Sequence, residues 1–253
     1  SKEDINFVKN LCKSSYYKNT IILPDKNGNI SLVIIFRNDT EDFFIGNEIS
    51  KLPKGIYFIK NELDISQTEE IFIGFGLASY SFNFYNQRNL FNVKLLISKN
   101  LDYKKIFNFL TSEYMVRNLV NTPASELGPE TFEKFLNLFS KRYNFTFRSY
   151  SERKYLKKNF PLIFEVGKGS FEKPRLIEMT FGTKTNFKVT LIGKGVCFDS
   201  GGLNIKPSVS MNTMKKDMGG AANIIGLAKL IVSYNLPVYL RVLIPIVENS
   251  ISK

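Results

Sequence analysis

An apolar strand that runs directly into a glycine-rich, charged turn constrains this chain more than any other feature. Residues 188–193 are typical of a buried strand, and the sequence KGVCFDSGG follows at residues 194–202. Over residues 194–217 the chain then carries Lys194, Asp199, Lys206 and Asp217. Buried charges cost several kcal/mol each unless they are paired or bind a metal. Two carboxylates and two amines beside tight glycine turns therefore predict a functional site.

The second half of the chain alternates between strand and helix patterns. The expected strands are residues 145–150, 161–166, 175–181, 188–193 and 238–246, and the expected helices are residues 129–143, 152–158 and 218–234. Such alternation predicts an α/β fold with a mostly parallel sheet that helices cover on both faces. Sites in such sheets lie beyond the C-terminal ends of the strands, which is where Lys194 and Asp199 fall.

The first 120 residues predict a separate mixed α/β domain. Expected strands are residues 20–23, 31–36, 55–60, 70–74 and 92–98, and the first two form a hairpin around Asn27-Gly28. Residues 74–76, Gly-Phe-Gly, are expected to form a turn. Residues 101–121 predict a helix, which ends where Pro123 removes a backbone donor.

Composition excludes several kinds of enzyme. The chain has no histidine, so Ser-His-Asp, Cys-His and HExxH chemistry is impossible, and a metal site must use oxygen ligands plus an unusual donor such as a neutral lysine amine. The only cysteines, Cys12 and Cys197, are expected to be reduced thiols of a cytoplasmic protein. No apolar run reaches the roughly 18 residues that span a membrane. The net charge of +12 fits weak nucleic-acid binding or a solvated lysine-rich surface.

The run GKGVCFDSGGLNIKPSVSMNTMKKDMGGAA, residues 193–222, resembles the signature of the leucyl aminopeptidase (cytosol aminopeptidase) family. These are two-metal exopeptidases with an α/β catalytic domain. NTPASEL at 121–127, VGKGS at 166–170, and the Ile-Pro and Glu-Asn pairs at 244–245 and 248–249 extend the resemblance over residues 113–253. It implies that residues 121–253 are the N-terminal part of an α/β/α catalytic domain. It also implies that residues 1–120 are an N-terminal α/β domain with a linker helix, so the domain boundary is expected near residue 120.

The resemblance also implies roles for individual residues. Asp199 would bridge two divalent ions, Zn²⁺ or Mn²⁺, and Asp217 and Lys194 would be further ligands, the lysine after losing its proton. Lys206 would stay protonated, contact the substrate and stabilise the oxyanion. Met214 would line the pocket for the substrate's first side chain. The alternatives are a helix-capping Asp199 or Asp217, a Lys194 paired with Asp199, a solvated Lys206 and a core Met214.

The family's second signature, Asn-Thr-Asp-Ala-Glu-Gly-Arg, does not occur in the 253 residues. It supplies further metal ligands and an arginine that holds bicarbonate. One ion would thus keep Lys194, Asp199 and Asp217 and the other only Asp199, so the chain by itself is expected to be inactive. The complete enzyme would form hexamers and release N-terminal residues, with a leucine-type preference, from peptides. The alternatives are a DNA-binding accessory protein of the same family and a non-catalytic structural relative.

Overall fold

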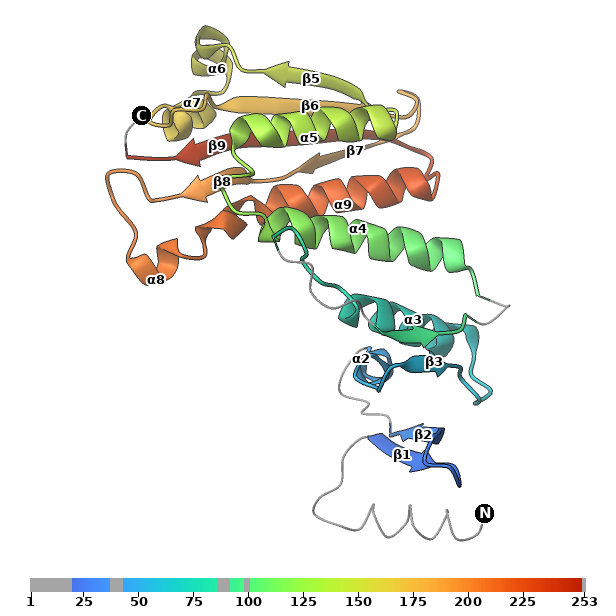
Figure 1. Ribbon diagram of the computed structural model, residues 1–253. Coiled ribbons are helices and arrows are strands. Elements are labelled where there is room, and N and C mark those ends of the chain that lie inside the picture. The colour runs from blue at the N-terminus through green and yellow to red at the C-terminus, as the bar shows by residue number, and fades with distance from the viewer. Residues whose placement is uncertain (1–19, 37–42, 86–91, 98–100, 252–253) are drawn as a thin grey trace. The chain divides into compact units, whose positions relative to one another are not determined.

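The computed structural model describes residues 20–36, 43–85, 92–97 and 101–251 (Figure 1). The chain divides into two compact units. The described residues up to Ser81 and those from 92 to Ile106 belong to the first unit, and residues 82–85 and those from Phe107 onward belong to the second. The boundary predicted near residue 120 stays a prediction. Cys12 lies outside the described residues, whereas Cys197 is a buried free thiol.

The first unit has the mixed α/β character that its sequence predicts. Strands β1 (Thr20–Pro24) and β2 (Ile30–Ile35) form the expected antiparallel hairpin, and the carboxylate of Asp25 accepts the N–H groups of Asn27 and Asn29 in its turn. Strands β3 (Gly55–Tyr57) and β4 (Val93–Leu95) pair in parallel. Helices α2 (Phe44–Ser50) and α3 (Ile65–Ala78) pack against each other.

Helix α3 corrects two predictions, because residues 70–74 are not a strand and residues 74–76 are not a turn. Asp64 begins this helix with a capping box, in which its carboxylate accepts the N–H of Gln67. A glycine occupies position 74 of this helix because the chain at the start of α2 comes too close for a side chain. A Cβ at Gly74 would lie 2.6 Å from the carbonyl oxygen of Phe43, and one at Gly46 would lie 2.2 Å from the nitrogen of Phe75.

The second unit contains most of the chain's regular structure. Its helices are α4 (Tyr103–Asn121, whose first residues belong to the first unit), α5 (Pro129–Arg142), α6 (Arg153–Asn159), α7 (Pro161–Gly167), α8 (Ser208–Met211), the 3₁₀ helix η1 (Met214–Met218) and α9 (Gly219–Ser233). Its strands are β5 (Thr146–Tyr150), β6 (Arg175–Phe181), β7 (Phe187–Ile192), β8 (Gly195–Asp199) and β9 (Val238–Asn249). Helix α7 replaces the strand predicted for residues 161–166, because Pro161 occupies the first helical turn. No described helix is long and apolar enough to cross a membrane.

The sheet of this unit is mostly parallel, as predicted, because β5, β7, β8 and β9 run in one direction, but β6 runs against them and makes the sheet mixed. Its order is β5-β6-β9-β7, and β8 pairs with β9 further along. β7 and β8 run parallel to β9, whereas β6 runs antiparallel to both β5 and β9. The five residues 182–186 that join β6 to β7 form a turn, which reverses the chain. Because β9 lies between these two strands, it can be parallel to only one of them.

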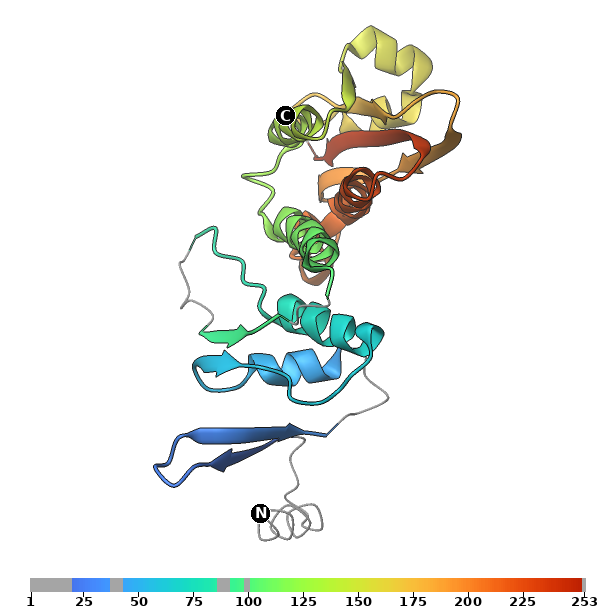
Figure 2. The same ribbon diagram turned by 90° about the vertical axis from the view of Figure 1, so that its right-hand side faces the viewer.

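The core lies on the face of the sheet that α5 and α9 cover (Figure 2). Alternate residues of β9 point into it and are fully buried, namely Leu240, Val242, Ile244 and Ile246. Phe132 and Leu136 of α5 and Ile225 of α9 pack onto them. On strand β6, Leu176 belongs to a separate cluster with Leu156 of α6 and Phe164 of α7. The central strand β9 is thus held firmly, and its C-terminal end is a rigid support for side chains.

Lys229, near the C-terminal end of α9, is a charged group inside this core. Lys229 is only 7% exposed, and its ammonium donates to Thr111 Oγ1 of α4 at 2.7 Å. Burial lowers the pKa of Lys229 to about 8, and the charge of Arg142 adds to this effect. The folded state therefore disfavours the protonated amine that the unfolded chain readily keeps.

We expect Lys229→Met to raise the free energy of unfolding by about 1–2 kcal/mol at neutral pH, because it removes a buried charge and keeps the aliphatic stem. In the parent protein stability should rise as pH increases from about 8 towards 10.5, where the unfolded chain binds the proton that the folded chain has released. This rise should be absent from the variant. Urea unfolding on both sides of pH 8 checks it, with the exposed Lys157→Met as control. A destabilised Lys229→Met protein would contradict the argument.

Candidate metal centre

Asp199 lies where two parallel strands end together. It is the last residue of β8, and its register partner is Asn249, the last residue of β9. The two strands approach closely at Gly195, where a Cβ would lie 2.6 Å from the carbonyl oxygen of Pro245. Asp199 lies at the C-terminal end of a strand, as predicted, but this strand is β8 and not the one expected at residues 188–193. Residues 195–199, expected to belong to a glycine-rich turn, are extended because they pair in parallel with β9, as such sites require.

The loop after β8 turns back on itself through two glycines with left-handed backbone. Gly201 has φ of 89° and Gly202 has φ of 67°, values that favour glycine strongly. A Cβ at Gly201 would also lie 2.3 Å from the carbonyl oxygen of Asn204. The backbone N–H of Lys206 donates to the carbonyl of Ser200 at 2.9 Å, which closes the loop. The side chain of Lys206 is thereby returned to the end of β8.

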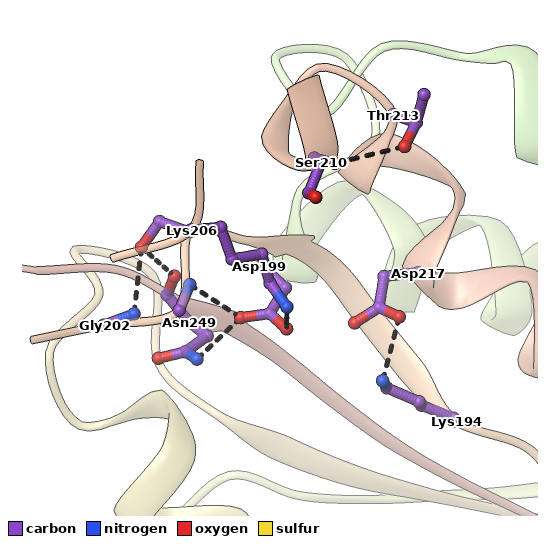
Figure 3. Close-up of polar contacts among 10 residues, drawn as sticks. Lys194, Asp199, Gly202, Lys206, Ser210, Thr213, Asp217 and Asn249 are labelled. Carbon is purple, nitrogen blue, oxygen red and sulfur yellow. Dashed lines mark hydrogen bonds and ion pairs between the residues drawn. The ribbon is translucent and has the colours of Figure 1, made fainter. Parts of the chain in front are cut away.

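The Asp199 carboxylate makes three polar contacts (Figure 3). Its Oδ1 accepts the N–H of Gly201 at 2.9 Å and the amide of Asn249 at 2.7 Å, and its Oδ2 lies 3.1 Å from Lys206 Nζ. Partial burial opposes its ionisation, but the Gly201 N–H, the Lys206 ammonium and the Asn249 amide outweigh burial and hold the pKa of Asp199 below its usual range. Asp199 is therefore an anion with one oxygen fully engaged.

Lys194 and Asp217 form the second polar pair. Lys194 follows β7, and Asp217 lies in η1, which packs against β8. Lys194 Nζ donates to Asp217 Oδ1 at 2.8 Å, so Lys194 pairs with Asp217 and not with Asp199. The carbonyl of Lys194 accepts the N–H of Ala221 at 2.9 Å. Small residues permit this contact, because a Cβ at Gly193 would lie 2.7 Å from the Cα of Ala221.

The second oxygen of Asp217 is the unusual atom of the site. Oδ2 is buried and has no hydrogen-bond partner among the described residues. Figure 3 shows the carboxylates of Asp217 and Asp199 pointing towards the same space, with Lys194 beside Asp217 and Lys206 beside Asp199. An unsatisfied buried carboxylate oxygen is costly, and a cation would satisfy it. The residues present therefore fit a metal ion.

The ligand set would have to include the lysine amine. Within the part of the chain that the structure describes, no three Cys, Asp or Glu side chains gather so as to hold a metal. Two carboxylates and one amine are available instead, from Asp199, Asp217 and Lys194. A cavity of about 380 Å³ opens beside Asp199, and Lys206 and Asn249 are among its other lining residues. Met214 begins η1 and is half-buried, and its role in substrate binding stays a prediction.

Asn249 belongs to this site although its sequence pattern assigns it no role. It lies 50 residues beyond Asp199, at the end of another strand. The segment that contains it contributes to the family resemblance, and neighbouring parallel strands bring their C-terminal ends together. The pairing of β8 with β9 was the missing information, because the chain pattern does not say which strands are neighbours.

Comparison with known proteins agrees with this geometry. Residues 114–253 match the model of the "Cytosol aminopeptidase family, catalytic domain", and residues 6–98 match "M17 aminopeptidase, N-terminal domain". A probable cytosol aminopeptidase of Clostridium perfringens is 32% identical over 229 residues, which cover 81% of this chain and 46% of that protein. The cytosol aminopeptidase of Encephalitozoon cuniculi is 28% identical, over 96% of this chain and 53% of its own length.

Solved structures show the same fold. The crystal structure of the cytosol aminopeptidase from Coxiella burnetii is 36% identical with a TM-score of 0.87, over 95% of this chain and 54% of that one. The bottromycin maturation enzyme BotP in complex with Mn is 23% identical with a TM-score of 0.74, over 91% of this chain and 54% of that one, and shares the fold. The chain spans about half the length of the relatives it matches. With both family domains matched in order and the charged motif folded at the end of β8, this chain belongs to the cytosol aminopeptidase family, a family of metal-dependent peptidases.

Proposed function

We propose that the complete protein is a two-metal aminopeptidase that releases N-terminal residues, with a leucine-type preference, from peptides. The observation that supports this is the gathering of Lys194, Asp199, Lys206 and Asp217 at one end of the sheet, as two ion pairs, of which Asp199–Lys206 lines an open cavity. Residues of a purely structural ion-pair network would not leave the buried Asp217 Oδ2 without a partner among the described residues.

Lys194, Asp199 and Asp217 would hold one divalent ion, and Asp199 would also be a ligand of the second. Zn²⁺ and Mn²⁺ both accept carboxylate and nitrogen ligands, and the Mn complex of the related BotP fold makes manganese a reasonable first test. The bound ions would hold the substrate's free amine and activate a water. Lys194, which now donates to Asp217 Oδ1, would have to release its proton to solvent when the ion binds, because Asp217 must stay ionised to be a ligand.

Lys206 would act on the substrate directly. Its ammonium already lies at the mouth of the site, with its side chain 31% exposed and Nζ 3.1 Å from Asp199 Oδ2. When metal ions bind Asp199, this ammonium would leave the carboxylate and donate to the scissile carbonyl oxygen. A donor that meets the developing negative charge there lowers the barrier to attack. The bicarbonate that assists proton transfer in the family would need an arginine that the 253 residues do not supply in the expected motif.

Assembly and location follow from the same proposal. We propose a homo-hexamer of the complete protein, in the cytoplasm, as the family resemblance implies. Nucleic-acid binding has weaker support, because several basic side chains are already paired with carboxylates, as in Lys51–Glu48 and Lys105–Glu69. Peptides are therefore the partners that the site favours.

Metal removal tests the proposed activity. The full-length protein should hydrolyse leucyl amide, lose this activity on treatment with EDTA, and regain it when Mn²⁺ or Zn²⁺ is added. The reason is that the ions held by the two carboxylates would activate the attacking water. A fragment that ends at Lys253 should be inactive with either ion. Activity of the full-length protein that persists after EDTA treatment and exhaustive dialysis would contradict the proposal.

A further inference from the structure

Asn249 joins the two strands that end at the candidate metal centre. Its backbone carbonyl accepts two hydrogen bonds from Ser200, from the N–H at 3.0 Å and from Oγ at 2.7 Å. Its side-chain amide donates to Asp199 Oδ1 at 2.7 Å. The backbone contacts and the amide contact are separate connections, so their effects can be separated by mutation.

The orientation of the Asn249 amide follows from chemistry as well as from the structure. An ionised carboxylate can only accept hydrogen bonds, so Nδ2 of Asn249 must face Asp199. The amide oxygen then faces Gly202, where a Cβ would lie 3.0 Å from it. The glycine loop therefore leaves room for the amide and packs against it, which limits rotation of the Asn249 side chain.

The two donors on Asp199 Oδ1 fix the rotation of the carboxylate. Gly201 N–H and Asn249 Nδ2 both bind Oδ1, while Oδ2 is left to the single cation Lys206. Gly201 supplies one direction of restraint from within the same loop. Asn249 supplies the other from β9, the strand whose alternate residues are fully buried in the core. The rigid sheet thereby determines which oxygen of Asp199 is left to Lys206.

We propose that Asn249 is a positioning residue that holds the Asp199 carboxylate in the orientation that binds metal. The inference rests on the proposed function, since it assigns Asp199 as a ligand. Asn249 would not touch the ion itself. Removal of a residue that hydrogen-bonds a metal ligand in this way typically weakens metal binding by about 10- to 100-fold.

The test measures Mn²⁺ affinity of the full-length protein by isothermal titration calorimetry, without any substrate. Asn249→Leu keeps the approximate size of the side chain and removes the amide, and Asn249→Ser shortens it so that it cannot reach Asp199. Both should bind Mn²⁺ about 10- to 100-fold more weakly than the parent protein. Ser200→Ala is the matched control, because it removes the Oγ bond to the Asn249 carbonyl, and the one that Oγ accepts from the Gly202 N–H, but keeps the Asn249 amide. It should bind Mn²⁺ as the parent does, even where its melting temperature falls as far as that of the Asn249 variants.

The outcomes separate this inference from the proposed function. Parent-like Mn²⁺ affinity in a folded Asn249→Leu or Asn249→Ser protein, with affinity lost in Asp199→Ala, would overturn the role of Asn249 and leave the metal centre intact. Equal losses in the Ser200→Ala control and in the Asn249 variants would also overturn it, because the strand connection would then be what matters. Parent-like affinity in Asp199→Ala would instead refute the metal centre itself.

Discussion

Lys206→Met in the full-length protein is expected to lower kcat for leucyl amide by about 100- to 1,000-fold, the usual effect of removing one oxyanion donor. Methionine keeps the length and apolar stem of the side chain but cannot donate a hydrogen bond. The substitution also removes the ammonium that lies 3.1 Å from Asp199 Oδ2. Mn²⁺ affinity should therefore stay the same or increase, since an ion no longer competes with Lys206 for that oxygen.

This combination distinguishes a catalytic lysine from a structural one. Steady-state kinetics at saturating Mn²⁺ and a separate Mn²⁺ titration measure the two effects. Lys216→Met is the control, because Lys216 is an exposed lysine in the same segment. A Lys206→Met enzyme that loses metal affinity in proportion to its activity would show that Lys206 holds the loop together and does not act on the substrate.

Asp199→Ala is expected to weaken Mn²⁺ binding by more than the roughly 10- to 100-fold that is typical when a residue hydrogen-bonded to a metal ligand is removed. Asp199 is the ligand proposed to be shared by both ions, so its loss affects each of them. A ligand that binds only the folded state raises the melting temperature. Added Mn²⁺ should therefore stabilise the parent protein against heat and should not stabilise Asp199→Ala.

The control for this second prediction is Asp25→Ala, in the β1–β2 turn. Asp25 is also an ionised carboxylate that accepts backbone N–H groups, but it lies in the first unit and outside the proposed site. That variant should keep the full stabilisation by Mn²⁺. Equal stabilisation of Asp199→Ala and the parent protein would mean that the ions bind elsewhere.

Most of the fold could be predicted where the pattern of apolar residues is regular. Helix α5 begins at Pro129 and buries Phe132, Leu136 and Phe139, as their spacing indicates. Helix α3 could not be predicted, because Gly74 permits a close approach of α2 that no local pattern reveals. The mixed character of the sheet was also hidden, since it depends on β9 lying between β6 and β7.

The site was predictable as far as its residues share one segment of the chain. Lys194, Asp199, Lys206 and Asp217 lie within one motif, and the structure gathers them in two ion pairs. Which lysine pairs with which carboxylate depends on how η1 and the glycine loop fold over β8, and the motif does not contain that information. Asn249 comes from a different strand, so only the register of β8 against β9 reveals it.

The central claim is that Lys194, Asp199 and Asp217 are ligands of one metal ion. Crystals of the full-length protein grown with Mn²⁺, with diffraction measured on both sides of the manganese absorption edge, test it most directly. The account predicts an anomalous peak within about 2.0–2.3 Å of an oxygen of Asp199, of Asp217 Oδ2 and of Lys194 Nζ, with Lys206 Nζ outside the coordination shell. A manganese peak away from Asp199 and Asp217, with their present ion pairs to Lys206 and Lys194 intact, would contradict it.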